Sequence, residues 1–258
     1  MPTALITGAS AGLGTDFARI LASMKYDLIL VARNESRLSA LAGELSTAHG
    51  IKCDVIALDL SQSGSAGTLY GRVSSAKHTI DVLVNNAGCG VWGPFAKSDP
   101  EALSRMLTLN INTLAELTRL ILPDMLRRDS GRILNVASTA AFQPGPWMAA
   151  YYASKAFVLS LGEALSVEAQ GTQVTISTLC PGPTRTEFFD RAGMASSRLK
   201  NLIFAESLKC AKNGINGMLK GKTVIVDGWL NLIVTQFARI MPRYVMRQVA
   251  GLINDSAK

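Results

Sequence analysis

The chain has 258 residues, of which 48% are hydrophobic, and a mean hydropathy of +0.23, so it can bury one sizeable core. It has no run of about eighteen uncharged apolar residues, which disfavours a membrane-spanning helix. Only two histidines are present, which disfavours a histidine-based triad and most metal sites, and the four cysteines are scattered, which disfavours a disulfide frame. No secretory leader precedes the first predicted strand, so we expect a cytoplasmic protein with reduced thiols and no nucleic-acid partner.

Short apolar runs alternate with stretches of helical periodicity along the chain. Strands are predicted at residues 3–7, 27–32, 52–58, 82–85, 133–136, 174–179 and 223–226. Helices are predicted from the turn after the first strand to Met24, at 36–48, after residue 60, from 100 to 128 and at 148–168. The alternation predicts an α/β fold: a Rossmann-like doubly wound parallel sheet of about seven strands with helices on both faces, in a single domain spanning 1–258.

A glycine-rich turn joins the first predicted strand to the first predicted helix. Gly8, Gly12 and Gly14 let the chain turn sharply and let a ligand approach the backbone. The helix that follows presents free N–H groups and the positive end of its dipole, which suit a pyrophosphate. The spacing Gly-x-x-x-Gly-x-Gly differs from the commonest dinucleotide fingerprint, so an ordinary glycine-rich turn is the alternative interpretation.

Tyr151 and Lys155 are four residues apart on a predicted helix that follows Ser138. Four residues are about one helical turn, so the two side chains share a face. A lysine ammonium there favours the phenolate and is expected to lower the tyrosine pKa, while a hydroxyl such as Ser138 can hold a carbonyl oxygen. An isolated Tyr-x-x-x-Lys match is usually just a helix surface, so the pair needs support from other motifs. Tyr152 is one residue off this spacing and should point about 100° away around the helix.

The motifs occur in one order and at compatible spacings: Thr7-Gly8-x-x-x-Gly12-x-Gly14, Asn85-Asn86-Ala87-Gly88, Asn110, Ser138, Tyr151-x-x-x-Lys155 and Pro181-Gly182. Together they resemble the short-chain dehydrogenase/reductase family of the single-domain type, from Thr3 to about Thr186. The resemblance implies hydride transfer between a nicotinamide and a carbonyl or secondary alcohol, and a homo-oligomer. The later part of the chain loosely resembles a branch that includes β-ketoacyl and 17β-hydroxysteroid reductases.

The resemblance also assigns roles. Tyr151 would exchange a proton with the carbonyl oxygen, and Lys155 would lower its pKa and bond the nicotinamide ribose. Ser138 would hold the developing oxyanion, and Asn110 would hold a water that passes protons to Lys155. Asp59 would hold the adenine amino group. The cofactor-binding residues implied are Gly8, Ser10, Gly12, Leu13, Gly14, Arg33, Asp59, Leu60, Asn86, Ala87, Gly88, Tyr151, Lys155, Pro181, Gly182, Thr184 and Thr186.

The end of the second predicted strand bears on cofactor choice. In dinucleotide folds an acid there binds the ribose 2′-hydroxyl, whereas an arginine accommodates a 2′-phosphate. Here Ala32 replaces the acid and Arg33 follows, and Ser10 could add a hydrogen bond, so NADP(H) is favoured over NAD(H). Arg33 as a solvated residue is the alternative, and Ala11 stands where many NADP-binding relatives place a second basic residue.

The substrate pocket is expected to be apolar. Residues 187–258 would supply a lid and a C-terminal segment. The aromatic and aliphatic candidates are Trp92, Phe95, Phe142, Trp147, Phe188, Phe189, Met194, Leu199, Leu202, Ile203 and Phe204. Each could equally serve core or lid packing, so a lipophilic ketone or aldehyde is a leaning. The rival functions are a dinucleotide-binding regulator without turnover and a membrane-surface or interaction protein.

The C-terminal segment carries the charge. Residues 1–184 contain 14 basic and 14 acidic side chains, whereas residues 185–258 contain 12 and 5, so the whole net charge of +7 lies there. Arg239, Arg243 and Arg247 recur every four residues in a largely apolar stretch from Trp229 to Ile253, which Pro242 should divide into two short helices. The apolar face would pack on the core or a partner subunit, or the segment would attach to an anionic membrane surface.

Overall fold

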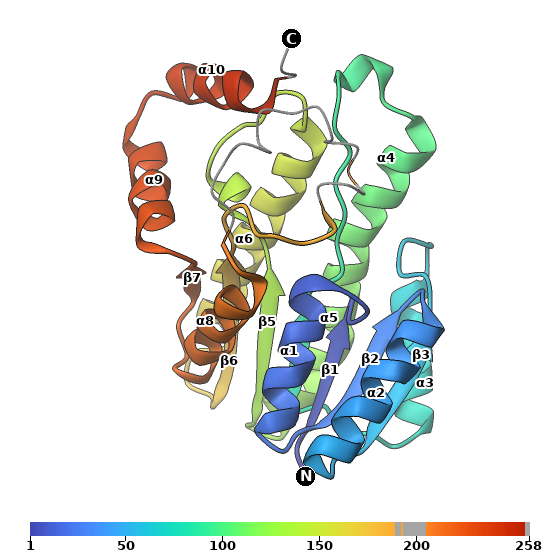
Figure 1. The fold of residues 1–258 in the computed structure, drawn as a ribbon. Coiled ribbons are helices and arrows are strands. Elements are labelled where there is room, and N and C mark those ends of the chain that lie inside the picture. The colour runs from blue at the N-terminus through green and yellow to red at the C-terminus, as the bar shows by residue number, and fades with distance from the viewer. Residues whose placement is uncertain (189–191, 193–204, 256–258) are drawn as a thin grey trace.

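A computed structural model of the protein describes residues 1–188, 192 and 205–255. In this part of the chain, one parallel seven-stranded sheet has the order β3-β2-β1-β4-β5-β6-β7 (Figure 1). The strands are β1 (Thr3–Thr7), β2 (Asp27–Ala32), β3 (Cys53–Ala57), β4 (Val82–Asn85), β5 (Gly131–Val136), β6 (Val174–Cys180) and β7 (Val224–Val226). The strand order reverses between β1 and β4, and such a switch point is where open α/β sheets bind ligands. The predicted doubly wound sheet is confirmed, with strand ends displaced by at most two residues.

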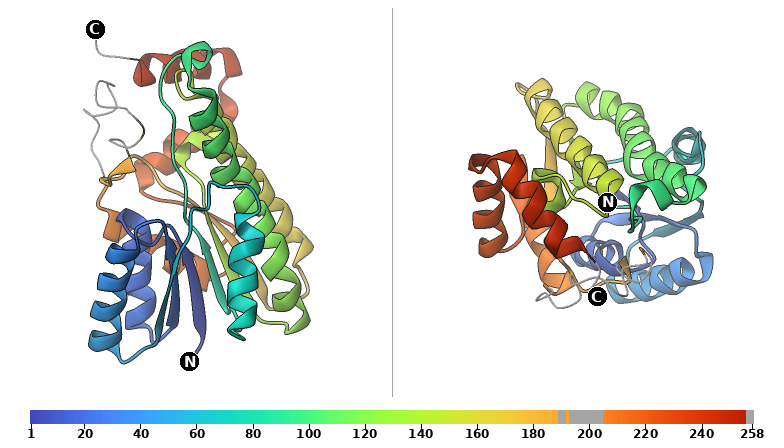
Figure 2. Two further views of the ribbon diagram at one scale, coloured as in Figure 1. Left: turned by 90° about the vertical axis from the view of Figure 1, so that its right-hand side faces the viewer. Right: turned by 90° about the horizontal axis from the view of Figure 1, so that it is seen from above.

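Helices cover both faces of the sheet (Figure 2). On one face lie α1 (Gly12–Ser23), α2 (Glu35–His49) and α8 (Ser207–Leu219), and on the other lie α3 (Ser65–Ser75), α5 (Leu114–Arg127) and α6 (Ala149–Glu168). β1 is buried along its whole length, as expected of a strand covered on both sides. Each face therefore has its own apolar core, and the sheet between them fixes where the strand ends lie.

Local signals place the helix ends. Asn34 caps α2 by accepting a hydrogen bond from the backbone N–H of Arg37, and Gly50 ends it in the left-handed conformation. Asp99 caps α4 (Pro100–Leu107) by accepting from the N–H groups of Glu101 and Ala102, with Pro100 at the first helical position. The predicted start of this helix at residue 100 is confirmed.

The helix predicted from 100 to 128 has an interruption. Between α4 and α5 the residues Thr108–Thr113 form a π-helical turn that contains Asn110. The predicted helical span from 100 to 128 is confirmed, but the prediction of one continuous α-helix is wrong. A π turn widens the helix locally without changing which residues are apolar, so periodicity does not reveal it. Such turns often occur at functional sites.

The C-terminal segment forms two helices, α9 (Trp229–Ile240) and α10 (Arg243–Asn254), separated at Pro242 as predicted. Both lie at the end of the molecule toward which the strands point (Figure 1). α10 buries Met246, Ala250 and Asn254, whereas Thr235 is the one buried residue of α9. The interpretation that the apolar face packs on the core is therefore wrong for α9. None of the described helices combines the length and apolarity that crossing a bilayer requires.

Gly162 allows α6 to lie close to the sheet, because a Cβ atom there would come within 2.0 Å of Thr178 Oγ1 on β6. We therefore expect Gly162→Ala to lower the free energy of unfolding by about 1–3 kcal/mol through overpacking. A Cβ atom added to Gly43 in α2 would have no heavy atom within 4 Å. Gly43→Ala should therefore raise the free energy of unfolding by about 0.5–1 kcal/mol. Urea denaturation of both variants measures the difference, and equal effects would contradict it.

Candidate functional site

The carboxyl ends of the strands open into one large cleft of about 1120 Å³. Segments that follow β1, β2, β3, β4, β5 and β6 line it, together with the start of α6 and parts of α9 and α10. Of the site residues predicted from the sequence, the cleft is lined by Gly8, Ser10, Gly12, Leu13, Arg33, Asp59, Leu60, Asn86, Ala87, Gly88, Ser138, Tyr151, Lys155, Pro181, Gly182, Thr184 and Thr186. Gly14 and Asn110 do not line it. The fold thus gathers residues from widely separated motifs around one space.

The turn after β1 approaches its neighbours too closely for side chains. Gly8 has φ +69°, and a Cβ there would lie 2.9 Å from the Ala87 Cα atom. A Cβ on Gly14 would lie 2.1 Å from the Gly8 carbonyl oxygen. Gly14 therefore lets α1 pack on the turn, and its contact with a cofactor stays a prediction. Ala11 at the helix start offers no side-chain cap, so the first N–H groups of α1 are free for an anion.

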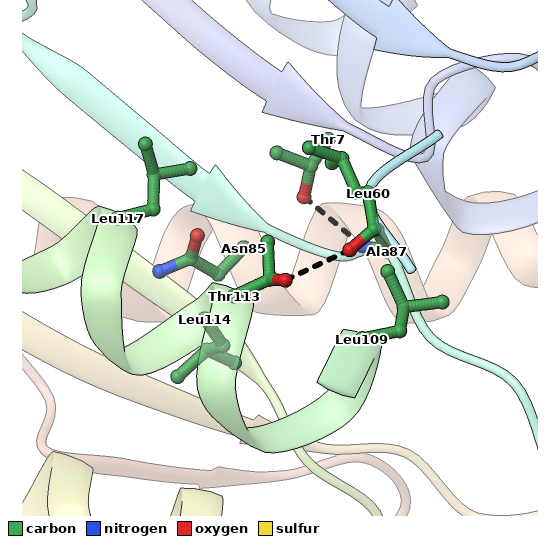
Figure 3. Close-up of a pocket in the computed structure, with 8 residues that line it drawn as sticks. All are labelled: Thr7, Leu60, Asn85, Ala87, Leu109, Thr113, Leu114 and Leu117. Atoms are coloured by element: carbon green, nitrogen blue, oxygen red, sulfur yellow. Dashed lines mark hydrogen bonds between the residues drawn. The ribbon is translucent and has the colours of Figure 1, made fainter. Parts of the chain in front are cut away.

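Asn86 ties the loop after β4 to the glycine-rich turn. Its Nδ2 donates to the carbonyl oxygens of Thr7 (2.9 Å) and Gly8 (3.2 Å). The Thr7 hydroxyl oxygen accepts from the N–H groups of Asn86 and Ala87, each at 3.0 Å. Figure 3 shows the Thr7–Ala87 bond above a small space between β4 and α5. These bonds satisfy buried backbone groups and fix the floor of the cleft.

Arg33 and Asp59 stand at one end of the cleft. Arg33 is exposed and has no acidic ion-pair partner among the described residues. Asp59 accepts from the N–H and hydroxyl of Ser61 at 3.0 and 2.7 Å. Partial burial acts to raise the pKa of Asp59, but these hydrogen bonds, with the charge of Arg33, hold it below its usual value. Asp59 is therefore an ionised acceptor at neutral pH, with a cation nearby.

Ser138 follows β5 and caps a short 3-10 helix (Thr139–Phe142), its hydroxyl oxygen accepting from the Ala140 N–H at 3.1 Å. The same side chain is hydrogen-bonded to the Tyr151 hydroxyl, which lowers the Tyr151 pKa. Burial is the larger effect and raises that pKa well above 10. The net shift is therefore upward, opposite in direction to the lowering expected from the motif, because desolvation outweighs the Ser138 hydrogen bond. Tyr151 is thus a protonated phenol at working pH.

Lys155 is buried beneath the cleft, with only 5% of its surface exposed. Its Nζ donates to the Val136 carbonyl oxygen at 2.8 Å and lies 5.9 Å from the centroid of the Tyr151 ring. Burial lowers the pKa of Lys155 to about 8. The predicted pair therefore does meet on one face of α6, and the lysine in it titrates only slightly above neutrality.

Asn110 lies behind the cleft, 1% exposed, in the π-helical turn. Its Oδ1 accepts from the Cys89 N–H at 3.0 Å, and its Nδ2 donates to the Cys89 carbonyl and to Ser154 Oγ. A Cβ on Gly88 would lie 3.3 Å from both Asn110 Oδ1 and Lys155 Nζ. Asn110 thus fixes the loop after β4 against the helix that carries Lys155.

The loop after β6 closes the far side of the cleft. The Pro181 carbonyl accepts from the Thr139 N–H at 2.8 Å, and Thr184 Oγ1 donates to the Gly182 carbonyl at 2.9 Å. A Cβ on Gly182 would lie 2.3 Å from Asn231 Nδ2 of α9, so this glycine also allows the C-terminal segment to pack. Glu187 forms an ion pair with Arg37 at 3.1 Å, which joins the end of this loop to α2.

The apolar candidates for the pocket separate into three groups. Trp92, Phe142 and Phe188 line the cleft, and the Phe188 ring lies 5.3 Å from that of Tyr151. Phe95 is 61% exposed, and neither Phe95 nor Trp147 is among the described residues that line the cleft. The remaining candidates, Phe189, Met194, Leu199, Leu202, Ile203 and Phe204, lie outside the described residues.

Sequence reasoning missed the contribution of α9 and α10 to the cleft, which Asn231, Val234, Thr235, Ala238 and Ile253 line. It also treated Tyr152 only as a decoy for Tyr151. The Tyr152 hydroxyl donates to Asn254 Oδ1 at 3.2 Å, and its ring packs flat against Gly145, where a Cβ would lie 2.3 Å away. Local sequence patterns cannot predict this contact, because it joins residues about one hundred positions apart in the chain.

A model of the short chain dehydrogenase family matches residues 2–195. The chain belongs to the short-chain dehydrogenase family. It is 33% identical to the ketoacyl reductase HetN of Nostoc sp. (strain PCC 7120) over 242 residues, which cover 93% of this chain and 82% of HetN. It is 32% identical to the very-long-chain 3-oxoacyl-CoA reductase of Anas platyrhynchos over 184 residues, 69% of this chain but only 58% of that protein.

Among solved structures, a short-chain dehydrogenase from Sphingobium yanoikuyae in complex with NADPH superposes with a TM-score of 0.83. The two are 31% identical, and the match covers 93% of this chain and 94% of the other. Membership of this family makes the protein an NAD(P)-dependent oxidoreductase that acts on a small molecule.

Tyr151→Phe should lower turnover by at least ~100-fold, the usual scale for a general acid, while nucleotide binding persists. Tyr152→Phe is the matched control: it removes a hydroxyl bonded to Asn254 and should leave turnover within a few-fold of normal. Steady-state kinetics with titration of the nucleotide checks both variants. A dead Tyr152→Phe variant beside a nearly normal Tyr151→Phe variant would overturn the assignment.

The pKa of Lys155 gives a pH dependence. Tyr151 stays protonated well into the alkaline range, so reduction should be limited by loss of the Lys155 charge. We expect kcat/KM for reduction to be constant below neutrality and to fall as pH rises through about 8. The residual activity of the Lys155→Arg variant should not show this fall with pH, because a guanidinium stays protonated in this pH range. A wild-type profile that continues level through pH 8 would refute the prediction.

Proposed function

We propose that the protein is an NADP(H)-dependent reductase of lipophilic carbonyl compounds, with Asn110, Ser138, Tyr151 and Lys155 as its catalytic set. The observation that carries the proposal is the buried Tyr151–Lys155 pair at the floor of the cleft, with Ser138 bonded to the Tyr151 hydroxyl. The cleft also fits a dinucleotide, because Gly8 and Gly12 adopt positive φ and the first turn of α1 leaves its N–H groups free. A bound nicotinamide would supply or receive the hydride.

The residues of the chain would handle the proton and the charge. Tyr151 is held as a phenol and donates its proton to the carbonyl oxygen of the substrate, which Ser138 binds through its hydroxyl. The Lys155 ammonium stabilises the phenolate left on Tyr151. Asn110 acts through its neighbours, because it holds the Cys89 backbone and Ser154 in place and does not reach the cleft.

The proposed preference for NADP(H) rests on the end of β2. Ala32 is buried and carries no acid, and Arg33 is exposed at the cleft beside Asp59. A guanidinium there can form charge-assisted hydrogen bonds with a 2′-phosphate. The Sphingobium relative, solved with NADPH, is consistent with this choice.

An apolar substrate is proposed because Trp92, Phe142 and Phe188 face the same space as Tyr151. The two relatives named above act on ketoacyl or 3-oxoacyl compounds, which supports a carbonyl on a hydrocarbon chain. A regulator without turnover is the weaker alternative, because such a protein needs none of the four catalytic side chains. Four free thiols agree with a reducing cytoplasm as the proposed location, and a homo-oligomer is proposed from the family alone.

The function is tested by following NADPH oxidation with purified protein and a graded set of ketones, aldehydes and 3-oxoacyl thioesters. We expect kcat/KM to increase with the length of the hydrocarbon chain. Absence of turnover with every compound, while NADPH still binds, would favour the regulator. Turnover confined to short polar carbonyls would refute the lipophilic pocket but leave the reductase intact.

Arg33→Ala tests the cofactor preference. Removing the guanidinium should weaken NADPH binding by ~1.5–3 kcal/mol, the cost of a lost bond to a charged group, and leave NADH binding almost unchanged. Arg72→Ala, which removes an exposed arginine that does not line the cleft, is the control and should affect neither nucleotide. Calorimetric titration with both nucleotides measures the difference. Equal affinities of the unaltered protein for NADPH and NADH would contradict the proposed cofactor preference.

A further inference from the structure

α9 exposes an apolar surface that no described part of the chain covers. The exposed fractions are 70% for Trp229, 57% for Ile233, 56% for Phe237 and 83% for Ile240. At 100° per residue these four side chains fall within an arc of about 80° on one side of the helix. Thr235, the buried residue of α9, points away from that arc. This ridge therefore faces solvent, which is unusual for large side chains clustered together.

α10 continues the surface. Its buried residues, Met246, Ala250 and Asn254, hold one side of the helix against the protein, while Tyr244 and Leu252 are 63% and 64% exposed. The two helices lie next to one another at the end of the molecule toward which the strands point (Figures 1 and 2), and both contribute residues that line the cleft. The apolar surface is thus formed by two helices that meet at Pro242.

Positive charge gathers where the two helices meet. Arg239 lies in the last turn of α9, and Arg243 and Arg247 lie in the first half of α10. All three are exposed, and none forms an ion pair with a described residue. The sequence from Trp229 to Asn254 contains no acidic residue. Apolar side chains, a tryptophan and a tyrosine next to unpaired arginines are the composition of helices that lie in the headgroup region of an anionic bilayer.

We infer that α9 and α10 form a docking surface for an anionic lipid bilayer. A second copy of the chain is the weaker occupant. A two-fold contact over this surface would bring two sets of three arginines into one interface, with no acid on either helix to balance them. An anionic membrane compensates all of them at once, and the ridge of α9 enters the apolar layer below the headgroups.

The docking surface is joined to the cleft. Val234 and Ala238 of α9 and Ile253 of α10 line the cleft, and none of them belongs to the exposed ridge. Asn254, fully buried, accepts from Tyr152 and, through its carbonyl, from the Trp92 indole at 2.9 Å, and donates to the Pro146 carbonyl at 3.1 Å. These bonds fix α10 to the helix that carries Tyr151. A bilayer bound to α9 and α10 therefore lies at the mouth of the cleft and can deliver a lipophilic substrate directly.

Flotation of the full-length protein with vesicles tests the inference. We expect the wild type to float with phosphatidylcholine–phosphatidylserine vesicles at low salt, and to float less with pure phosphatidylcholine or at high salt. Each basic residue near an anionic surface contributes about five-fold, so changing Arg239, Arg243 and Arg247 together to glutamine should weaken binding about 100-fold. A matched control changes Lys52, Arg72 and Arg119, three exposed cations away from the two helices, to glutamine and should retain binding.

A second variant, Ile233→Ser with Phe237→Ser, removes part of the ridge without touching residues that line the cleft. It should abolish flotation and leave reduction of a water-soluble ketone, measured without vesicles, unchanged. This activity assay separates failure of docking from failure of the proposed reductase. Absence of wild-type flotation, or equal losses in both charge variants, would overturn the inference. Conversion of a dimer to monomers by the serine variant, without vesicle binding, would assign the surface to a second copy instead.

Discussion

Burial of the Lys155 ammonium is the constraint on which the rest of the site depends. A cation inside a protein is costly unless its donors are satisfied, and here Val136, the last residue of β5, accepts one hydrogen bond at 2.8 Å. α6 must therefore lie close to the sheet, which Gly162 permits. Gly88 must also leave room for Nζ, since a Cβ there would lie 3.3 Å from it. The close packing of α6 and the loop after β4 are consequences of this one group.

The buried cation affects stability as well as chemistry. Its folded-state pKa of about 8 is below the ordinary value of 10.5, so the unfolded chain binds more protons between these limits. Stability should accordingly rise with pH across that window, and the charge costs on the order of 3 kcal/mol at neutral pH. Tyr151 shows the complementary effect, because burial keeps it protonated. One apolar environment thus places a proton on the phenol and leaves the lysine close to titration, which is the condition that the proposed proton transfer needs.

The C-terminal helices are part of the same arrangement. Asn254 connects α10 to Tyr152, the neighbour of Tyr151, and Asn231 of α9 packs on Gly182 in the loop after β6. Two segments far apart in sequence therefore build one wall of the cleft. A surface that bound a membrane would be rigidly connected to the site, so the position of the bilayer would be set by the fold rather than by a flexible linker.

The strands, the start of the helix at residue 100 and the motif residues could be predicted from the sequence, because each is a local property. A buried parallel strand is an apolar run, Asp99-Pro100-Glu101 is a helix start, and Pro242 divides a helix wherever it occurs. The sequence also predicted that Tyr151 and Lys155 share a helix face. The sign of the Tyr151 pKa shift could not be predicted in this way, because desolvation depends on what α6 packs against in the folded protein. The same holds for the packing role of Gly14, the π turn at Asn110 and the exposed ridge of α9. An amphipathic pattern says that a helix has an apolar face, but only the arrangement of the other elements says whether that face is covered.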